Sequence, residues 1–265
     1  MTGDGQSLSK KAVPLIVTPL EGIPTVRQGD DLASLVLSAL DRTGIALADG
    51  DILVLAQKIV SKSEGRMVRL DSVTPSPRAQ EIAAAANKDP RVVELILAES
   101  RELVRTRPGV IIVEDRRGFV MANAGIDASN VEHAEGTEAV LLLPADPDAS
   151  AARLRDEIRA RVGVSVGVVV NDSFGRAWRL GTTGTAIGVA GIPALLDLRG
   201  RPDRTGRVLQ TSELGVADEV AAAASLMMGQ GDEGRPVVHL RGFPYAATDG
   251  KAADLVRPRT MDLFR

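Results

Sequence analysis

The sequence predicts a mixed α/β fold, of the α/β or α+β class, because short apolar runs alternate with longer segments of helical periodicity. The clearest strands are residues 52–55 and 164–170, both rich in branched aliphatic side chains. The clearest helix is the alanine-rich segment 216–228. With 265 residues and 44% hydrophobic content, the chain can bury one large core or two modest ones, which indicates a globular protein of enzyme size.

The other elements have their own signals along the chain. Apolar runs bounded by turn residues predict strands at 13–18, 139–143, 186–195 (with a small helix at its end) and 237–240, and a hairpin over 110–123 with a charged turn at 115–118. Helical periodicity or a first-turn proline predicts helices at 30–40, 77–87, 90–105 and 149–161. We divide the chain into a polar N-terminal tail (1–12), a main domain (13–247) and a polar C-terminal tail or linker (248–265), which is either a frayed terminus or a docking segment.

Composition excludes several classes of function. The net charge is −3, with basic and acidic residues spread along the chain, so neither nucleic acid nor a membrane is expected as a partner. There is no cysteine, and the two histidines, His133 and His239, are far apart, so any bound metal must rely on oxygen ligands. No apolar run approaches the roughly 20 residues of a membrane span, and no signal peptide is evident, so a cytoplasmic location is expected.

The stretch VVVNDSFGRAWRLGTTG combines a buried strand with polar chemistry. Asp172 and Ser173 are predicted at the carboxyl end of the 164–170 strand, where open α/β sheets place ligands. Their oxygens suit Mg²⁺ or Mn²⁺, although Asn-Asp-Ser by itself is more typical of a turn that caps the strand. Arg176 and Arg179 follow, and guanidinium groups bind phosphate or carboxylate with paired donors. A metal and a polyanionic ligand are therefore expected here.

A second polar stretch, MANAGIDASNVE, contains Asn123, Asp127, Ser129 and Asn130. These side chains are typical either of an Asx-turn with a helix cap or of metal or nucleotide binding. If Asp127 meets Asp172 across a cleft, two carboxylates can hold one metal or share two, as in phosphoryl-transfer enzymes.

Two further stretches contain potential phosphate ligands. Lys62, between Ser61 and Ser63, can bind phosphate or be solvated, and neither it nor Lys58 lies in a Walker sequence. The segment MMGQGDEGR contains GxGxxG but follows a helix, so it is not a dinucleotide fingerprint. It is either a helix cap or a loop whose amides line a nucleotide pocket.

Several stretches together, LEGIPTVRQGDDL, DGDILVLAQKIVSKSEGR, NAGIDASNV, VVVNDSFGRAWRLGTTGTAIGVAGI and VADEVAAAASLMMGQGDEG, closely resemble the coenzyme F420-0:L-glutamate ligase family. The resemblance runs in order over nearly the whole chain. It implies a two-lobed mixed sheet, an intertwined homodimer, and an enzyme that uses GTP, Mg²⁺ or Mn²⁺ at two sites, and K⁺ to join L-glutamate to coenzyme F420-0.

The resemblance also implies roles for individual residues. Asp127 and Asp172 would hold one metal, and Ser173 with Gln230 a second; relatives can have an acidic residue at the last position, and a neutral amide binds metal less strongly. Arg176 and Arg179 are assigned to phosphate or the anionic substrate on physical grounds, and Lys62 is grouped with the catalytic residues. The implied nucleotide contacts are Ile23, Pro24, Thr25, Val26, Gln57, Lys62, Asn130, Met228, Gly229, Gln230, Gly231, Asp232, Glu233 and Gly234.

The implied reaction passes through an acyl phosphate and requires no cysteine or histidine nucleophile. The alternative is a non-catalytic module that binds GTP or the deazaflavin, or a partner subunit for a flavin-dependent domain. Actinobacterial relatives carry a nitroreductase-like flavin domain, so two alternatives are expected here: a stand-alone ligase, or one half of a split or truncated two-domain enzyme that works beside a separate flavin-binding partner. The number of glutamates added, the preferred metal, and the choice between F420-0 and a dehydro precursor stay open.

Overall fold

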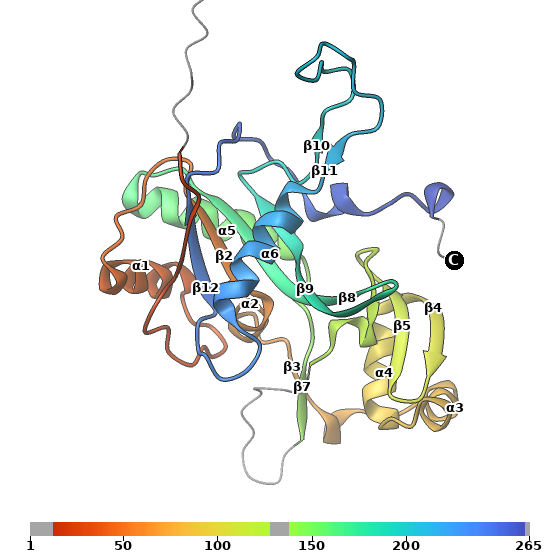
Figure 1. Cartoon of the computed structure of the whole chain (residues 1–265). Helices are drawn as coiled ribbons and strands as arrows, with labels where there is room; N and C mark the ends of the chain where they lie inside the picture. The colour runs from red at the N-terminus through yellow and green to blue at the C-terminus, as the bar shows by residue number, and fades with distance from the viewer. Residues whose placement is uncertain (1–12, 128–137, 263–265) are drawn as a thin grey trace, which may run out of the picture.

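The computed structural model describes residues 13–127 and 138–262, and Figure 1 shows them as a larger and a smaller lobe. The larger lobe is built on a five-stranded mixed sheet in the order β1-β12-β2-β8-β9. Its strands are β1 (Ile16–Pro19), β2 (Ile52–Ala56), β8 (Gly167–Arg176), β9 (Arg179–Ala190) and β12 (Val237–Arg241). β2 and β8 are parallel and the other neighbours antiparallel, so β1, β2 and β8 all run in one direction.

Helices cover both faces of this sheet (Figure 1). α1 (Leu32–Thr43) and α5 (Pro147–Val162) pack on the face that carries Leu53, Leu55, Val168 and Val170. α6 (Val216–Met228) packs on the opposite face, against Ile52, Val54 and Val169. Because both faces are buried, β2 and residues 167–170 of β8 are apolar without alternation, which is the pattern from which they were predicted.

The smaller lobe is a three-stranded antiparallel sheet with a separate core. It contains β4 (Ser100–Arg107), β5 (Val110–Asp115) and β6 (Val120–Ala122), covered by α3 (Pro77–Ala86) and α4 (Pro90–Ala98). The short ladder of β3 (Met67–Arg69) with β7 (Ala139–Leu141) lies between the lobes (Figure 1). The β5–β6 hairpin, α3 and the helix over 216–228 agree with the predictions.

The prediction of one helix over 90–105 is wrong in its second half. α4 ends at Ala98, and Ser100–Arg107 is a strand that pairs with β5. Pro108 and Gly109, with Gly109 at φ 86°, form the turn between the two strands. Pairing with a neighbouring strand outweighs the moderate helix propensity of Leu103 and Arg105, since propensity is a weak prior against tertiary contacts.

The prediction that a strand ends at residue 170 is also wrong. β8 continues to Arg176 and turns directly into β9, which begins seven residues before the predicted strand 186–195. The small helix predicted at the end of this strand is not formed, since residues 191–195 are irregular. Gly191 (φ 76°) and Pro193 lead instead to β10 (Leu196–Asp197), which pairs with β11 (Glu213–Leu214) in a projecting arm (Figure 1). The hairpin persists because β8 and β9 pair with each other beyond the end of β2.

Part of the predicted tail packs on the larger lobe. The Gly250 amide donates to the Ile192 carbonyl at 3.1 Å, and the Ala252 amide donates to Asp148 Oδ1 at 2.9 Å. Ala252, in the 3₁₀ turn η3 (Ala252–Leu255), is fully buried. Among the residues of the two described ranges, no helix is both long and apolar enough to cross a membrane.

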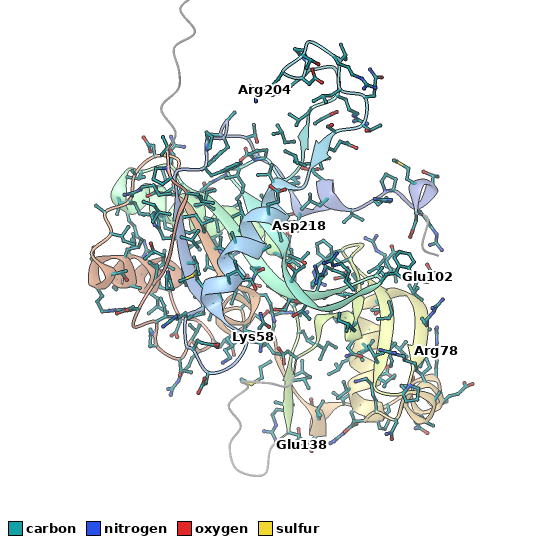
Figure 2. The ribbon with its side chains drawn as sticks, in the orientation of Figure 1. Lys58, Arg78, Glu102, Glu138, Arg204 and Asp218 are labelled. Carbon is teal, nitrogen blue, oxygen red and sulfur yellow. The ribbon has the colours of Figure 1, made fainter. Side chains whose placement is uncertain are left out.

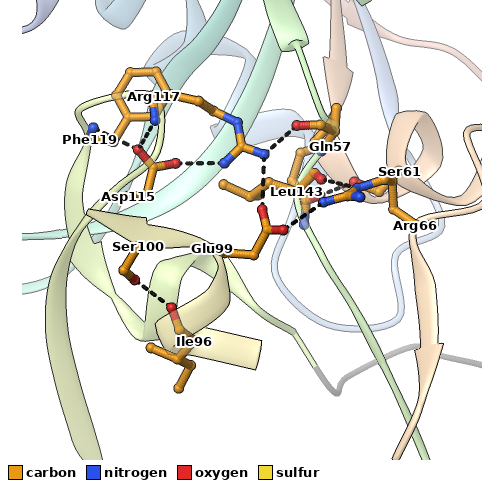
Figure 3. Close-up of polar contacts among 11 residues, drawn as sticks. Gln57, Ser61, Arg66, Ile96, Glu99, Ser100, Asp115, Arg117, Phe119 and Leu143 are labelled. Carbon is orange, nitrogen blue, oxygen red and sulfur yellow. Dashed lines mark hydrogen bonds and ion pairs between the residues drawn. The ribbon is translucent and has the colours of Figure 1, made fainter. Parts of the chain in front are cut away.

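A chain of charged side chains joins the two lobes (Figure 3). Arg117 donates to Asp115 Oδ2 at 2.8 Å and lies 3.5 Å from Glu99, and Glu99 accepts from Arg66 at 3.2 Å. Arg66 and Arg117 also donate to the carbonyls of Leu143 (2.8 Å) and Pro144 (2.6 Å), just after β7. Asp115 is fully buried, so its charge depends on Arg117 and on backbone amides for compensation.

We expect Arg117→Met to lower the free energy of unfolding by about 3 kcal/mol, because it leaves the Asp115 carboxylate buried without its cation. Arg69→Met is the matched control, since Arg69 also pairs with an aspartate, Asp71, but at the surface, and it should change the free energy of unfolding far less. Urea denaturation measures both. Equal losses in the two variants would contradict the role of the network.

Candidate functional site

Four chain segments meet at one edge of the five-stranded sheet. Because β1, β2 and β8 run in the same direction, their carboxyl ends lie at this edge, and antiparallel β12 begins there. A cavity of about 780 Å³ opens at this position. That volume lies within the range of small-molecule sites, roughly 300–1,000 Å³.

The cavity collects most of the residues singled out from the sequence. The predicted residues that line it are Ile23, Pro24, Thr25, Val26, Gln57, Lys62, Asp127, Asp172, Ser173, Met228, Gly229, Gln230, Gly231, Asp232 and Gly234. They come from the β1–α1 loop, from α2 (Gln57–Ser63), from β8, and from the end of α6 with the α6–β12 loop. Asp127 comes from the segment between β6 and β7. Segments far apart in sequence thus share one site, although their individual roles stay predictions.

Asp172 and Ser173 project beyond the end of β2. The last parallel pair is Ala56 with Asn171, and a register irregularity in the β8–β9 ladder lies between Val170 and Asn171. After Ala56 the chain turns into α2, so the next two residues of β8 face the cavity instead of a neighbouring strand. Ser173 Oγ donates to Gln230 Oε1 at 2.9 Å, which brings together the two side chains implied as ligands of a second metal.

Asp127 is held in place through its backbone. Its amide and carbonyl pair with Leu141 at 3.0 and 2.8 Å. Before it, Asn123, Ala124 and Gly125 all have positive φ, and a Cβ on Gly125 would lie 2.8 Å from the side chains of Leu143 and Met121. Asn123 Oδ1 accepts from the Ile111 amide at 3.2 Å, so its side chain fastens this turn to β5; this is a bond between distant segments and not the local bond of an Asx-turn.

The carboxylates of the cavity lie in an electrostatically unfavourable setting. Loss of solvation, together with the negative charge of Asp127, raises the pKa of Asp172 from 3.8 to about 6. A hydrogen bond from the Ser173 amide and the positive charge of Lys58 lower this pKa and so offset part of the increase. Lys58 Nζ lies 2.7 Å from Asp127 Oδ2. Two carboxylates that share one lysine would gain from a further cation.

The donors at this edge suit a hard divalent ion. Asp127, Asp172, Ser173 and Gln230 offer carboxylate, hydroxyl and amide oxygens, which are the ligands of Mg²⁺ and Mn²⁺. Over residues 13–127 and 138–262, no three acidic, histidine or cysteine side chains gather as a ready-made metal cluster. A divalent ion held here would therefore need water or a phosphate oxygen to complete its coordination shell, as is usual for Mg²⁺.

Comparison with known proteins assigns the chain to a family. A model of F420-0:gamma-glutamyl ligases matches residues 22–242. The chain belongs to this family. It is 47% identical over 248 residues to the coenzyme F420:L-glutamate ligase of Methanothermobacter thermautotrophicus, covering 93% of this chain and 97% of that one. It is 45% identical over 219 residues to the enzyme of the same name from Methanocaldococcus jannaschii, covering 83% and 86%.

Some residues predicted for the site lie elsewhere. Arg176 and Arg179 flank the tip of the β8–β9 hairpin, are exposed and do not line the cavity; Arg176 donates to the Leu180 carbonyl. Glu233 is also exposed and outside the lining, but it accepts from the Gly231 amide at 2.8 Å and so shapes the loop that carries Gln230. Asn130 lies outside the described residues.

Sequence reasoning missed Lys58, Asn171 and Arg235, which also line the cavity. Asn171 is buried and donates to Met228 Sδ at 3.4 Å, which ties β8 to the end of α6. A usable signal existed for Lys58, because it is the second residue after the buried strand β2, where ligands of parallel strands are expected. Arg235 has no comparable local signal.

We expect Asp172→Asn to stabilise the protein without metal or nucleotide. The folded state holds the Asp172 proton up to a pKa of about 6 and the unfolded state only to about 3.8, so stability falls as pH rises through this window. The gain from asparagine should be about 1–3 kcal/mol at pH 8 and smaller at pH 5, as measured by urea denaturation. Asp127→Asn is the control and should bring no gain, since it removes the partner of Lys58. A loss of stability in Asp172→Asn at pH 8 would show that this carboxylate is not under strain.

Proposed function

We propose that the protein is a GTP- and divalent-metal-dependent ligase that joins L-glutamate to coenzyme F420-0. The observation that carries the proposal is the placement of Asp127, Asp172, Ser173 and Gln230 around one cavity, in a chain of the F420-0:gamma-glutamyl ligase family. The names of its relatives support the substrate and the reaction class. The size and polarity of the cavity support a nucleotide beside the coenzyme carboxylate.

Binding of the reactants follows from the lining residues. The β1–α1 loop (Ile23, Pro24, Thr25, Val26) and the glycine-rich loop 228–234 would hold the nucleotide through backbone groups and close contacts. Lys62, with Asn130 by resemblance, would contact its polar groups. Asp127 and Asp172 would hold one Mg²⁺ or Mn²⁺, and Ser173 with Gln230 a second. Bound divalent ions would supply charge neutralisation for the phosphate oxygens.

The proposed reaction proceeds in two steps. A carboxylate oxygen of the coenzyme attacks the γ-phosphorus of GTP, the bond to the bridging oxygen breaks, and GDP leaves with an acyl phosphate formed. The glutamate amine then attacks the acyl carbon, forms the amide, and releases phosphate and a proton. Because phosphoryl transfer depends mainly on positioning and charge stabilisation, the cavity needs no covalent nucleophile.

The proposal also covers repeated glutamate addition, K⁺, a partner protein and the location of the enzyme. Successive glutamates would be added through their γ-carboxylates after the first, K⁺ would assist as the resemblance implies, and a separate nitroreductase-like flavin protein is a possible partner. A cytoplasmic location is also proposed. None of these features alters the roles given to the cavity residues.

A homodimer is supported by the tip of the β8–β9 hairpin. Trp178 and Leu180 are 83% and 98% exposed there, and the tip extends from the larger lobe towards the smaller one (Figure 1). Large apolar side chains at the end of a hairpin are typical of a protein interface. In a dimer, Arg176 and Arg179 would lie at that interface.

We expect the double substitution Trp178→Ser with Leu180→Ser to convert the dimer to a monomer, because the tip would lose its apolar contact surface. Analytical ultracentrifugation measures the change. Leu226→Ser is the control, since Leu226 is also an exposed leucine (86%) but lies on α6. If the double variant sediments like the wild type, the hairpin tip is not part of the dimer interface.

The proposed activity predicts a ladder of products, each heavier by one glutamate residue, when coenzyme F420-0 is incubated with protein, GTP, Mn²⁺ and L-glutamate. Mass spectrometry of the coenzyme detects it. Asp172→Ala should abolish the ladder because it removes a metal ligand. Asp71→Ala should retain it, since Asp71 is an exposed carboxylate that lies outside the cavity.

Absence of products with the wild type, when GTP still binds, would instead support a non-catalytic binding module or a subunit that requires its flavin partner. Products formed equally well by Asp172→Ala would contradict the metal site. The first result concerns the whole chain, and the second concerns only the residue assignment.

A further inference from the structure

Lys58 forms an ion pair with one carboxylate of the proposed metal site, that of Asp127. Its ammonium lies 2.7 Å from Asp127 Oδ2, and the side chains of both residues are 28% exposed. Figure 2 labels Lys58 near the start of α2, well away from Arg204 on the β10–β11 arm. Both members of the pair line the cavity, together with Asp172. None of the metal or nucleotide roles implied by the family resemblance involves Lys58.

The backbone places Lys58 beside the carboxylates. It lies in the first turn of α2, directly after β2, and the last β2–β8 pair joins Ala56 to Asn171, the neighbour of Asp172. Asp127 is fixed from the other side by its backbone pair with Leu141. The lysine side chain has a flexible four-carbon stem and is partly exposed, so its ammonium group can leave Asp127 without movement of the helix.

Two cations compete for one carboxylate when both approach within a few ångströms. A divalent ion on Asp127 and Asp172 would repel an ammonium group held 2.7 Å from Asp127 Oδ2. The displaced ammonium would remain inside the cavity, where a phosphate chain is the anion available to it. An ammonium there binds as a compact point charge, as phosphate-binding lysines do.

We propose, on the basis of the proposed function, that Lys58 is a resident cation of the metal site, which neutralises Asp127 until a divalent ion takes the carboxylate and then binds the terminal phosphate of the nucleoside triphosphate. Lys58 is thus a further catalytic residue, and its two partners, Asp127 and phosphate, are used in turn. Lys62, one turn later on the same helix, provides a second positive charge to the cavity.

The test is the affinity of nucleotide-free protein for Mn²⁺, measured by the electron paramagnetic resonance of free Mn²⁺. Lys58→Met removes the competing charge, so we expect Mn²⁺ to bind about tenfold more tightly than in the wild type. Lys58→Arg keeps the charge and should bind Mn²⁺ as the wild type does. Lys62→Met is the matched control for loss of a cavity lysine and should change the affinity less. Asp127→Asn should bind Mn²⁺ more weakly.

A second readout tests the phosphate partner. In the presence of Mg²⁺, the preference of the wild type for a non-hydrolysable GTP analogue over GDP should fall about tenfold in Lys58→Met, because the terminal phosphate loses a cation. Lys58→Gln is a second neutral variant in case the methionine variant is poorly folded, and thermal unfolding verifies both.

The outcomes separate this role from the proposed function. If the wild type binds Mn²⁺ but Lys58→Met binds it no more tightly, or if its preference for the triphosphate is unchanged, the role of Lys58 is overturned and the ligase proposal stands. If the wild type fails to bind Mn²⁺ both in the presence and in the absence of GTP, the proposal of a divalent-metal site is overturned. The proposed role of Lys58 is then overturned with it.

Discussion

The parallel pairing of β2 with β8, and its early end, is the constraint on which the site depends. β2 stops at Ala56 and enters α2, whereas β8 continues for five residues beyond Asn171 with only β9 beside it. The space beyond the end of β2 is therefore bounded by the first turn of α2 on one side and by Asp172 and Ser173 on the other. Had both strands ended together, these side chains would have belonged to an ordinary strand-to-loop turn.

The same arrangement accounts for the electrostatics of the cavity. A strand that continues past the sheet keeps Asp172 largely away from solvent, and the turn before Asp127 brings a second carboxylate near it. A hydrogen bond from the Ser173 amide to Asp172 and the positive charge of Lys58, at the start of α2, offset part of this repulsion. Such a site is costly in the free state and favourable once cations bind, which is common where function and stability oppose each other.

The sequence predicted best what depends on local pattern. β2 and the helix α6 follow from apolar runs and alanine content, and both are where they were expected. The helix over 90–105 and the end of the strand at residue 170 failed because each was decided by pairing with a distant or later strand, which local pattern does not record. In the site, Asp127 and Asp172 line the same cavity, as expected. Arg176 and Arg179 lie outside it, because β8 extends to Arg176 and places both arginines at the tip of the hairpin.

The lobe interface sets the remaining geometry of the site. Asp127 belongs to the segment that leaves the smaller lobe after β6, and its backbone partner Leu141 belongs to β7. The residues that follow Leu141 are fastened by Arg66 and Arg117, whose guanidinium groups hold the carbonyls of Leu143 and Pro144 while sharing Glu99. A partly buried charge network outside the cavity therefore helps to set the position of Asp127 relative to Asp172. Because a metal site tolerates little change in the distance between its ligands, the network that joins the lobes would be part of what lets the two carboxylates serve the proposed metal site together.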